Sequence, residues 1–389
     1  MKSEWKTIRA DEFCSLVTDG THGSPKPQAA GRKLITSKHL KGYYLDFESA
    51  NWISSEDYEK VIARSSVEQW DILYSMIGTI GNVYLEKNPV VDYACKNVGI
   101  FKFGGNCNKA YWMYYYLKSP QAMEFIKAHL RGTTQLYVPL ATLREMPVPV
   151  PDEEEMNKIV AILRTLDDKI QCSIKINDNL LRQAQALYKN RFIDLKPFNG
   201  EMPPDWQLGT VSEIIELHDS KRIPLSSRER ANLTKIYPYY GATSVMDYVD
   251  RYLFDGIYLL LGEDGTVVDD KGFPILQYVE GKFWVNNHAH IITGKNGFTV
   301  ETLYLLFSLT NVRSIVTGAV QPKISQANLN NVSVVIPSKA ELSTFNSIVQ
   351  PIFSQIRNLR AESDRLTSTR DILLPRLMSG EIDVSAVHL

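Results

Sequence analysis

The sequence predicts an α+β protein: two globular α/β modules separated by two long antiparallel helices that form a coiled coil, with an internal pseudo-twofold repeat. Two observations predict this class. One passage occurs twice at an offset of 186 residues, and a heptad spacing of apolar residues follows each copy. A chain of 389 residues is also too long for one ordinary core.

The repeated passage begins at Gly132 as GTTQLYVPLATLREMPVPVPDEEE and at Gly318 as GAVQPKISQANLNNVSVVIPSKAE. Residues 132–187 and 318–373 share twelve identities without a gap. In both copies the alternating stretch, MPVPVP or VSVVIP, predicts a short strand. Proline cannot donate to a strand ladder, so the first copy belongs at a sheet edge.

A long helix is predicted after each strand, beginning at about Asp152 and about Ser338. Each would span about 35 residues, or roughly 50 Å at 1.5 Å per residue. A helix of this length needs a partner, and two repeats in one chain can pair antiparallel. The seams are Ile159, Leu163, Leu166, Ile170, Ser173, Asn177, Leu180, Ala184 and Leu187, and Phe345, Val349, Ile352, Ile356, Leu359, Ser363, Leu366, Arg370 and Leu373.

Three residues interrupt the apolar pattern of these helices. Both seams turn polar, at Asn177 and Ser363, which we interpret as a device that fixes helix register. Pro351 lies inside the second helix and predicts a bend, because proline removes a backbone donor and crowds the preceding turn.

A globular block precedes each strand and helix. Trp5 and Trp206 mark the two starts, and DILYSMIGTIGNV (71–83) resembles DGIYLLLGEDGTV (255–267). The glycine pairs Gly78/Gly262 and Gly81/Gly265 predict a tight connection after an apolar strand. Elsewhere the blocks differ, so the chain combines two variable modules with one repeated frame.

This duplicated order, with the phrases VTDGTHGSPK, LITSKHL, YPYYGAT and YLLLGEDG, resembles the specificity subunits of Type I restriction-modification systems over essentially the whole chain. The resemblance implies a non-catalytic, sequence-specific DNA-binding subunit. Its two target-recognition domains, 1–150 and 201–336, would each read one half of a bipartite asymmetric site in double-stranded DNA. Residues 151–200 and 337–389 would supply the spacer helices, a linker and a C-terminal tail.

The resemblance also implies partners. Two methyltransferase subunits would dock on the helices, where Arg164, Lys169, Lys175 and Arg182 are candidate contacts, and ATP-dependent restriction subunits would join through them. S-adenosylmethionine, Mg²⁺ and ATP would belong to those partners, leaving this chain without cofactor or metal. The sequence itself contains no P-loop and no methyltransferase motif of the Asn/Asp-Pro-Pro-aromatic type.

Residues 20–45 contain no acidic residue and combine basic side chains with short hydroxyls. Such side chains can neutralise phosphates and reach base edges, although a solvated surface loop is the plainer alternative. The candidate DNA contacts are Thr21, His22, Ser24, Lys26, Arg32, Lys33, Thr36, Ser37, Lys38, His39 and Lys41.

The second block has a comparable basic stretch before YPYYGATS at 237–244. Its tyrosines could line a groove or pack in a core. Because basic stretches occur at matching places in both blocks, we favour DNA contact. The candidates are Lys221, Arg222, Arg228, Arg230, Tyr239, Tyr240 and Thr243.

Gln135 and Gln321 occupy the same place in the two copies of the repeat. Glutamine reads adenine well, but a reader shared by both modules would give both the same preference. We therefore favour a structural hydrogen bond for each glutamine.

Two other functions remain open on the sequence alone. One is a coiled-coil scaffold whose two modules bind protein. The other is a Mg²⁺-dependent nuclease built on Asp270, Glu280 and Lys282, which has no counterpart in the first block. The HAH sequence at 288–290 predicts strand residues with one buried histidine and no third metal ligand.

Composition narrows the class further. The formal net charge is -1, and the four cysteines have no spacing that suits zinc. No start resembles a signal peptide, and no apolar run approaches the ~20 residues that cross a bilayer. These features predict a cytoplasmic protein with reduced thiols.

Overall fold

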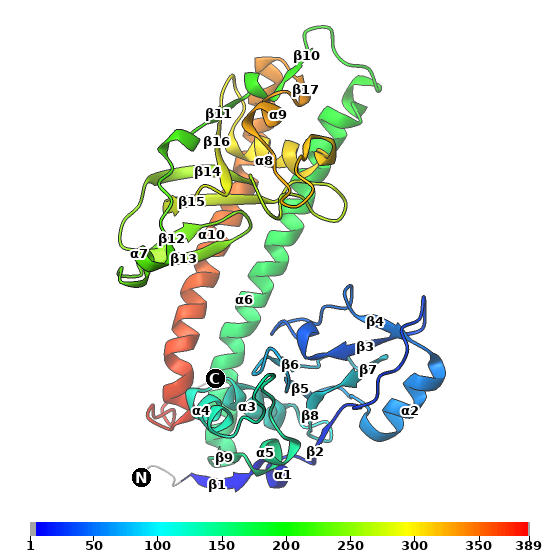
Figure 1. The fold of residues 1–389 in the computed structure, drawn as a ribbon. Helices are drawn as coiled ribbons and strands as arrows, with labels where there is room; N and C mark the ends of the chain where they lie inside the picture. Colours follow the sequence, from blue (N-terminus) through cyan, green and yellow to red (C-terminus); the bar gives the residue numbers. More distant parts are fainter. Residues whose placement is uncertain (1–4, 388–389) are drawn as a thin grey trace. The chain divides into compact units, whose positions relative to one another are not determined.

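The computed structural model describes residues 5–387, and the chain divides into two compact units (Figure 1). Unit 1 contains Met1–Cys172 and Glu362–Leu389, and unit 2 contains Ser173–Ala361. Each unit therefore holds one globular block together with one part of each long helix.

The long helices are α6 (Glu153–Tyr188) and α10 (Lys339–Met378), of 36 and 40 residues. The predicted starts are confirmed by the capping contacts. The backbone N–H of Glu155 donates to Asp152 Oδ1 at 2.8 Å, and that of Glu341 donates to Ser338 Oγ at 3.4 Å. The second helix continues through Pro351 without interruption.

Inside unit 1 the two helical segments run in opposite directions. Lys158 of α6 donates to Ser385 O, beyond the end of α10, and Lys169, further along α6, pairs with Glu362 at 2.6 Å. The same sense holds in unit 2, where the π-helical turn after α6 (Lys189–Ile193) contacts the first turns of α10. There Arg191 pairs with Glu341, and the Phe192 and Phe345 ring centroids are 4.8 Å apart.

Most positions of the predicted seams are buried, which is what gives each helix its inward face. Leu187 is an exception: its side chain is 41% exposed, and Tyr188 is buried in its place. A straight helix has 3.6 residues per turn, so a strict heptad drifts by ~20° per repeat and the inward position moves to the next residue. Asn177 Oδ1 and Ser363 Oγ are buried without a hydrogen-bond partner among the described residues. A role for them in helix register remains a prediction.

A buried ion pair joins the helices to the globular block in unit 1. Arg370 of α10 donates to Asp167 Oδ1 of α6 at 2.8 Å, and the Tyr43 hydroxyl, from the block, donates to the same carboxylate at 3.1 Å. Burial, with the negative charge of Asp167, raises the pKa of Tyr43 to about 12. The phenol therefore keeps its proton and its hydrogen bond at neutral pH.

Unit 1 contains a four-stranded antiparallel sheet in the order β2-β8-β5-β6 and a three-stranded sheet in the order β4-β3-β7. In the second sheet β3 pairs parallel with β7. The strands are β2 (Leu16–Asp19), β3 (Arg32–Thr36), β4 (Asn51–Ile53), β5 (Ile72–Ser75), β6 (Val83–Leu85), β7 (Tyr93–Lys96) and β8 (Val98–Lys102).

The helices of unit 1 pack its core. α3 (Cys107–Leu117) buries every residue from Ala110 to Leu117, so it is an interior helix rather than an amphipathic one. The remaining helices are α1 (Ala10–Phe13), α2 (Ser55–Ser65), α4 (Pro120–Ala128) and α5 (Leu140–Glu145).

Unit 2 contains one six-stranded sheet in the order β11-β16-β14-β15-β12-β13. The strands are β11 (Ile215–Leu217), β12 (Tyr237–Tyr240), β13 (Val245–Val249), β14 (Phe254–Gly262), β15 (Leu276–Val285) and β16 (Ala289–Gly294). The helices are α7 (Ser227–Ala231), α8 (Val300–Ser308) and α9 (Gln326–Asn330).

The two units have the same strand topology, which the dissimilar sequences did not reveal. The antiparallel order β2-β8-β5-β6 of unit 1 matches β11-β16-β14-β15 of unit 2. The strand β3 pairs parallel with β7, just as β12 pairs parallel with the end of β15. The single strand β15 of unit 2 therefore corresponds to two strands, β6 and β7, in unit 1.

The repeated passage forms the predicted short strands. β9 (Pro147–Val150) pairs antiparallel with β1 (Lys6–Arg9), and β17 (Ser333–Ile336) pairs antiparallel with β10 (Gln207–Thr210). Each pair is a separate two-stranded sheet, so the prolines of β9 need no second neighbour.

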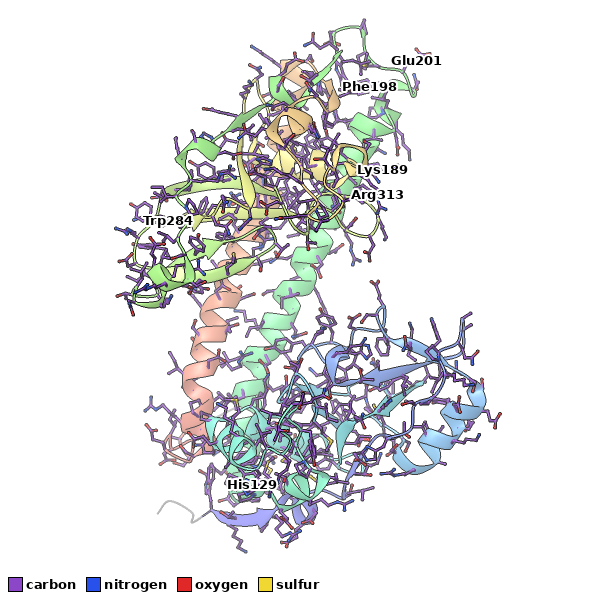
Figure 2. The ribbon with its side chains drawn as sticks, viewed as in Figure 1. His129, Lys189, Phe198, Glu201, Trp284 and Arg313 are labelled. Atoms are coloured by element: carbon purple, nitrogen blue, oxygen red, sulfur yellow. The ribbon has the colours of Figure 1, made fainter. Side chains whose placement is uncertain are left out.

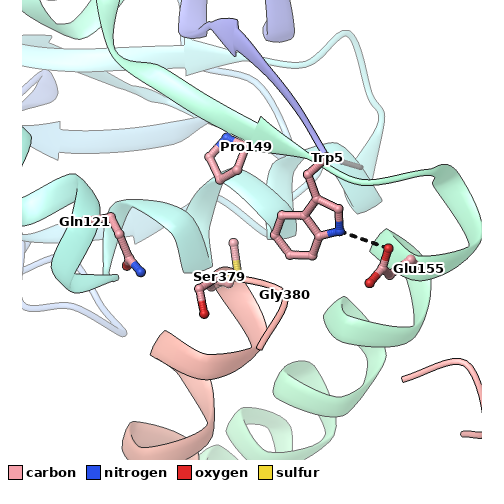
Figure 3. A pocket seen from close by; sticks show the side chains of 7 residues that line it. Trp5, Gln121, Pro149, Glu155, Ser379 and Gly380 are labelled. Atoms are coloured by element: carbon pink, nitrogen blue, oxygen red, sulfur yellow. Dashed lines mark hydrogen bonds between the residues drawn. The ribbon is translucent and has the colours of Figure 1, made fainter. Parts of the chain in front are cut away.

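Trp5 lies beside the end of α10 within unit 1. Trp5 donates through its indole N–H to Glu155 Oε2 at 3.0 Å (Figure 3). Gly380 adopts φ +68°, and a Cβ there would lie 3.1 Å from the Trp5 ring, so glycine permits this close approach. A cavity of 390 Å³ remains beside them, lined by Gln121, Pro149 and Ser379 among others.

Candidate nucleic-acid interface

In unit 1 the connections at one edge of the sheets gather into a group that we call loop cluster 1: residues 20–24, 37–41, 76–82, 97 and 131–137. Ser37 Oγ donates to Asn97 O at 3.1 Å and accepts from Ile77 N at 3.4 Å. The backbone N–H of Val138 donates to Met76 O at 2.9 Å, which attaches the hairpin 131–137 to the β5–β6 connection.

The equivalent connections of unit 2 form loop cluster 2: residues 218–222, 263–275, 286–288 and 317–323. The backbone N–H of Glu263 donates to His288 O at 2.9 Å, and that of Ile324 donates to Glu263 O at 2.8 Å. Gly265 N donates to Pro322 O at 2.9 Å. Apart from residues 37–41, which follow β3 and have no counterpart in loop cluster 2, the two units present matching connections with different side chains.

A hairpin with one shared geometry occurs in both loop clusters. Arg131 and Tyr137 exchange two backbone hydrogen bonds, as do Thr317 and Lys323. Gly132 has φ +96° and Gly318 has φ +89°, and a Cβ on either would lie 2.3 Å from a carbonyl oxygen of the same turn. Only glycine fits that position, which explains its identity in both copies.

The structural role that we expected for the repeated glutamines is wrong. Gln135 and Gln321 lie at the tips of these hairpins and are exposed. Within residues 5–387 neither side-chain amide forms a hydrogen bond.

The exposed basic residues of unit 1 lie in or beside loop cluster 1. His22, Lys26, Arg32, Lys38 and Lys41 are all exposed, as is Ser24. Lys33 is half-buried, with Nζ 4.0 Å from the Trp52 ring, while Thr21 and Thr36 are also partly covered. Arg64 of α2 was not predicted as a contact; it donates to Asp19 Oδ1 at 2.7 Å beside His22.

Two predicted contacts of unit 1 are interior residues. Ser37 bridges two loops as described above, and His39 accepts a hydrogen bond from Thr36 N on Nδ1 at 2.9 Å. Burial lowers the pKa of His39, so its ring is neutral at pH 7 and suits this acceptor role. We therefore assign both residues to the folding of the turn and not to the surface that could meet DNA.

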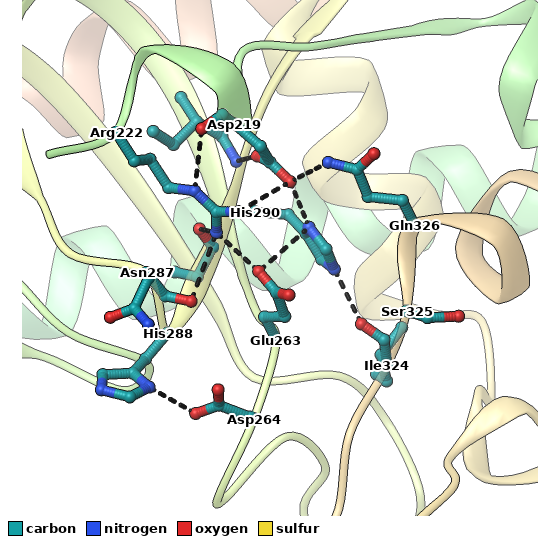
Figure 4. Close-up of polar contacts among 12 residues, drawn as sticks. Asp219, Arg222, Glu263, Asp264, Asn287, His288, His290, Ile324, Ser325 and Gln326 are labelled. Carbon is teal, nitrogen blue, oxygen red and sulfur yellow. Dashed lines mark hydrogen bonds and ion pairs between the residues drawn. The ribbon is translucent and has the colours of Figure 1, made fainter. Parts of the chain in front are cut away.

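In unit 2 the predicted contact Arg222 belongs to a buried polar network (Figure 4). Its guanidinium donates to Glu263 Oε2 at 2.5 Å and to Ala289 O at 2.8 Å. His290 is fully buried, with Nδ1 2.6 Å from Asp219 Oδ2 and Nε2 2.8 Å from Ile324 O. The network links the base of the hairpin 317–323 to β16.

The Asp219 carboxylate is the centre of this network. Burial alone would raise its pKa, but hydrogen bonds from His290, Gln326 and the backbone of Ile291 outweigh burial and hold the pKa below its usual range. The charged carboxylate is therefore the stable form inside unit 2.

The expectation of one buried histidine in HAH is confirmed by His290, but the expectation that no third metal ligand lies near it is wrong. Asp219, Glu263 and His290 are the group, within the described part of the chain, whose ligand atoms lie close enough to hold a metal ion. The group does not suit a cation, because Arg222 already supplies positive charge and both His290 nitrogens face oxygen atoms. We interpret it as a structural ion network.

The other predicted contacts of unit 2 are divided between surface and core. Lys221, Arg228 and Thr243 are exposed, and Tyr240 is half-buried. Tyr239 is buried under Arg230, whose guanidinium carbon lies 4.8 Å from the ring centre.

Arg230 is also neutralised by an acid. It donates to Asp247 Oδ2 at 3.0 Å, and Lys235 donates to Oδ1 of the same carboxylate at 2.9 Å. The hydrogen bond from Lys235, with those from Tyr248 N and Arg230, lowers the pKa of Asp247.

The residues of the alternative nuclease site do not come together. Glu280 and Lys282 lie on β15, while Asp270 lies in the β14–β15 connection. The Asp270 carbonyl accepts a hydrogen bond from Arg313, the residue labelled in Figure 2. The metal-binding group that the described residues do offer contains none of the three.

The two units share one strand topology, each has a loop cluster of its own chemistry, and each holds part of both long helices. These features define a duplicated, two-module protein. The family model for the Type I restriction modification DNA specificity domain matches residues 2–182 and 203–367. The chain belongs to this family, and the sequence-based recognition is confirmed.

Similar proteins cover most of the chain. The specificity subunit of the Type I restriction enzyme MjaIX of Methanocaldococcus jannaschii is 26% identical over 90% of this chain and 86% of its own length. The HindI specificity subunit of Haemophilus influenzae is 21% identical over 82% of this chain and 88% of its own. The solved S subunit of a Type I system from M. genitalium shares the fold, with a TM-score of 0.59, 17% identity and 96% coverage of both chains.

Two further properties concern the helices and the cysteines. No helix in the described range combines the length and the apolar character that crossing a membrane requires. Cys14 and Cys95 are buried free thiols, and burial raises the pKa of each.

Proposed function

We propose that this chain is the DNA-reading subunit of a Type I restriction-modification complex, in which each unit reads one half of a bipartite asymmetric target. The methyl transfer and the ATP-driven cleavage would be carried out by partner subunits with their own S-adenosylmethionine, Mg²⁺ and ATP. The chain itself would bind and position the DNA.

One observation carries the proposal: the two units repeat a single topology but differ in the loops that the topology presents. Equivalent connections are basic and acid-free in unit 1, whereas in unit 2 they carry a mixed set of charges. A duplicated frame with divergent loops suits a protein that must read two different sequences with the same geometry. Exposed Lys and Arg would meet phosphates, and hydroxyls and amides would meet base edges.

We further propose that α6 and α10 act as the spacer between the two half-sites. Both helices pass from one unit into the other, so both must change if the spacing is to change. Buried seams along α6 and α10 support an antiparallel coiled coil between them and a pseudo-twofold relation between the units.

Two methyltransferase subunits would dock on these helices. Ile174 and Ile176 of α6 are 44% and 41% exposed, on either side of the exposed Lys175, and Arg182 is exposed further along. Arg164 and Lys169 are less available, because Arg164 pairs with Asp168 and Lys169 pairs with Glu362. Exposed isoleucines beside unpaired cations suit a protein partner with apolar and acidic residues.

The direct test is co-expression of the chain with a methyltransferase subunit, followed by sequencing of methylated bases in the host DNA. Methylation of one split, asymmetric sequence is the expected result, and Ile174→Asp with Ile176→Asp should abolish assembly without unfolding the chain. An assembled complex that binds no DNA would instead identify a protein scaffold.

The spacer is tested by lengthening both helices at the residues where one unit ends and the other begins in the sequence. Seven residues inserted after Cys172 and seven after Ala361 keep the heptad and add roughly 10 Å at 1.5 Å per residue. With base pairs 3.4 Å apart, the gap should grow by about three base pairs while both half-sites stay the same. An insertion after Asn190 would miss the spacer, because α6 ends at Tyr188. An unchanged gap would exclude the spacer role.

A further inference from the structure

The hairpin tips, residues 132–136 and 318–322, are exposed and yet share the same glycine and the same glutamine. The reading of two different half-sites does not explain why these exposed residues are shared. Loop clusters that read different bases should differ, and most of their side chains do. The tips nevertheless keep the left-handed glycine, the hydrogen-bonded base and the glutamine at the same place in both units. What they contact should therefore be common to both half-sites.

Each tip is exposed and is closed by hydrogen bonds at its base. The hairpin base is held by two backbone hydrogen bonds of 2.7–2.9 Å and by a further bond to the neighbouring strand connection, from Val138 N in unit 1 and Ile324 N in unit 2. Beside the free glutamine amide, each tip exposes an aliphatic side chain, though on opposite sides of the glutamine: Leu136, which follows Gln135, is 48% exposed, and Val320, which precedes Gln321, is 99% exposed. A fully exposed valine on a firmly held turn is poorly explained by folding.

The chemistry of the tips favours the base stack over the phosphates. Neither 132–136 nor 318–322 contains a charged residue. Contacts to phosphate use Lys and Arg heavily, whereas proteins that open or kink the duplex insert aliphatic side chains between base steps and place Asn or Gln beside base edges. An amide can donate and accept in one plane, so it can pair with whichever base lies opposite.

We propose that each hairpin tip inserts into the duplex at its half-site and holds the helix open where a base must leave the stack. This role rests on the proposed function, since an enzyme that modifies a base in duplex DNA has to turn that base out of the helix. The aliphatic side chain takes the place of the lost stacking, and Gln135 or Gln321 hydrogen-bonds the base that is left without its partner. The need is the same in both half-sites, so the same tip serves both units.

The test uses the assembled complex and duplexes of its own target, methylated on one strand so that each half-site is assayed alone. Gln135→Ala should slow methylation of the half-site read by unit 1 by about tenfold or more, and Gln321→Ala should do so only at the other. Fluorescence of 2-aminopurine at the target base should fall in the same pattern. Gln121 and Gln207 are exposed glutamines outside the loop clusters. Gln121→Ala and Gln207→Ala therefore serve as controls and should change neither the methylation rate nor the fluorescence.

A mismatch at the target base separates this role from a merely structural one. A base that is already unpaired costs less to extrude, so the mismatched duplex should restore most of the rate lost in Gln135→Ala and Gln321→Ala. Wild-type rates in both variants, or a loss that the mismatch does not relieve, would overturn the inference while leaving target recognition intact. Loss of specific DNA binding by the wild-type complex would instead refute the proposed function itself.

Discussion

The basic stretches of the two units look alike in sequence but differ in the charge that they expose. In unit 1 residues 20–45 carry no acid, and Lys26, Lys38 and Lys41 remain on the surface. In unit 2 comparable cations are paired: Arg222 with Glu263, and Arg230 with Asp247. The first stretch can meet an anionic partner directly, whereas much of the second holds its own unit together.

The difference teaches that the number of basic residues does not measure the charge available for binding. A cation that becomes buried must be paired, since an unpaired buried charge is strongly destabilising. Unit 2 satisfies this requirement with Asp219, Glu263 and Asp247, which lie far from one another in the sequence. Each unit should therefore respond differently to the removal of similar residues.

The largest expected effect is the loss of His290 from unit 2. His290→Ala removes the buried imidazole from Asp219 and Ile324 O, although Asp219 keeps its hydrogen bonds from Gln326 and Ile291 N. The change should lower the free energy of unfolding by about 3 kcal/mol. Urea denaturation followed by circular dichroism measures this change. His22→Ala in unit 1 is the matched control: its side chain is 65% exposed beside Asp19, so about 1 kcal/mol or less is expected. Equal losses in both variants would contradict the contrast between the units.

The next effect concerns DNA affinity and its dependence on salt. Neutralising Lys26, Arg32, Lys38 and Lys41 together with glutamine should weaken binding by the assembled complex about 100-fold. The slope of log affinity against log salt should fall by about 3 to 4, because each phosphate contact contributes ~0.9. Fluorescence anisotropy at several salt concentrations gives both values. Arg230→Gln alone, which removes a guanidinium already paired with Asp247, should change the slope by less than about 1.

A smaller effect tests what the units have in common. Gly132→Ala and Gly318→Ala should each destabilise the protein by about 2 kcal/mol, because both positions require a left-handed backbone and leave no room for Cβ. Gly105→Ala is the control, since φ is +84° there but no atom lies within 4 Å of the added carbon. Its cost should be lower, and thermal unfolding compares the three. Unequal losses of stability in Gly132→Ala and Gly318→Ala would show that the two hairpins differ in energy although their backbone geometry is the same.

The smallest effect is the acid dependence of unit 2. The pKa of Asp219 is lowered in the folded protein, while an unfolded Asp titrates near 3.9. The stabilisation from its charged form is therefore complete above about pH 4 and is lost as pH falls through the lower folded pKa. Between about pH 5 and pH 2 the wild type should lose more stability than Asp219→Asn, which equilibrium unfolding at each pH would reveal. Parallel curves would exclude this contribution.

Much of the fold follows from patterns that extend over neighbouring residues. The strands β9 and β17 and the starts of α6 and α10 were predicted from alternation, heptads and capping residues, and all are present. The common topology of the two units was not predicted, because strand pairing joins residues as distant as Ile215 and Gly294 and leaves no local signature. For the same reason Leu187 was placed inward when Tyr188 is the buried residue.

The candidate interface divides in the same way. The sequence by itself determined the repeated frame, the family and the location of the basic stretches, since each depends on residue type and spacing along the chain. Only the tertiary structure decided that His39 and Tyr239 are interior, that Arg222 is paired and that Gln135 and Gln321 are free. Burial and charge pairing arise from contacts between distant segments, so the same residue type can be a binding group in one unit and a structural group in the other.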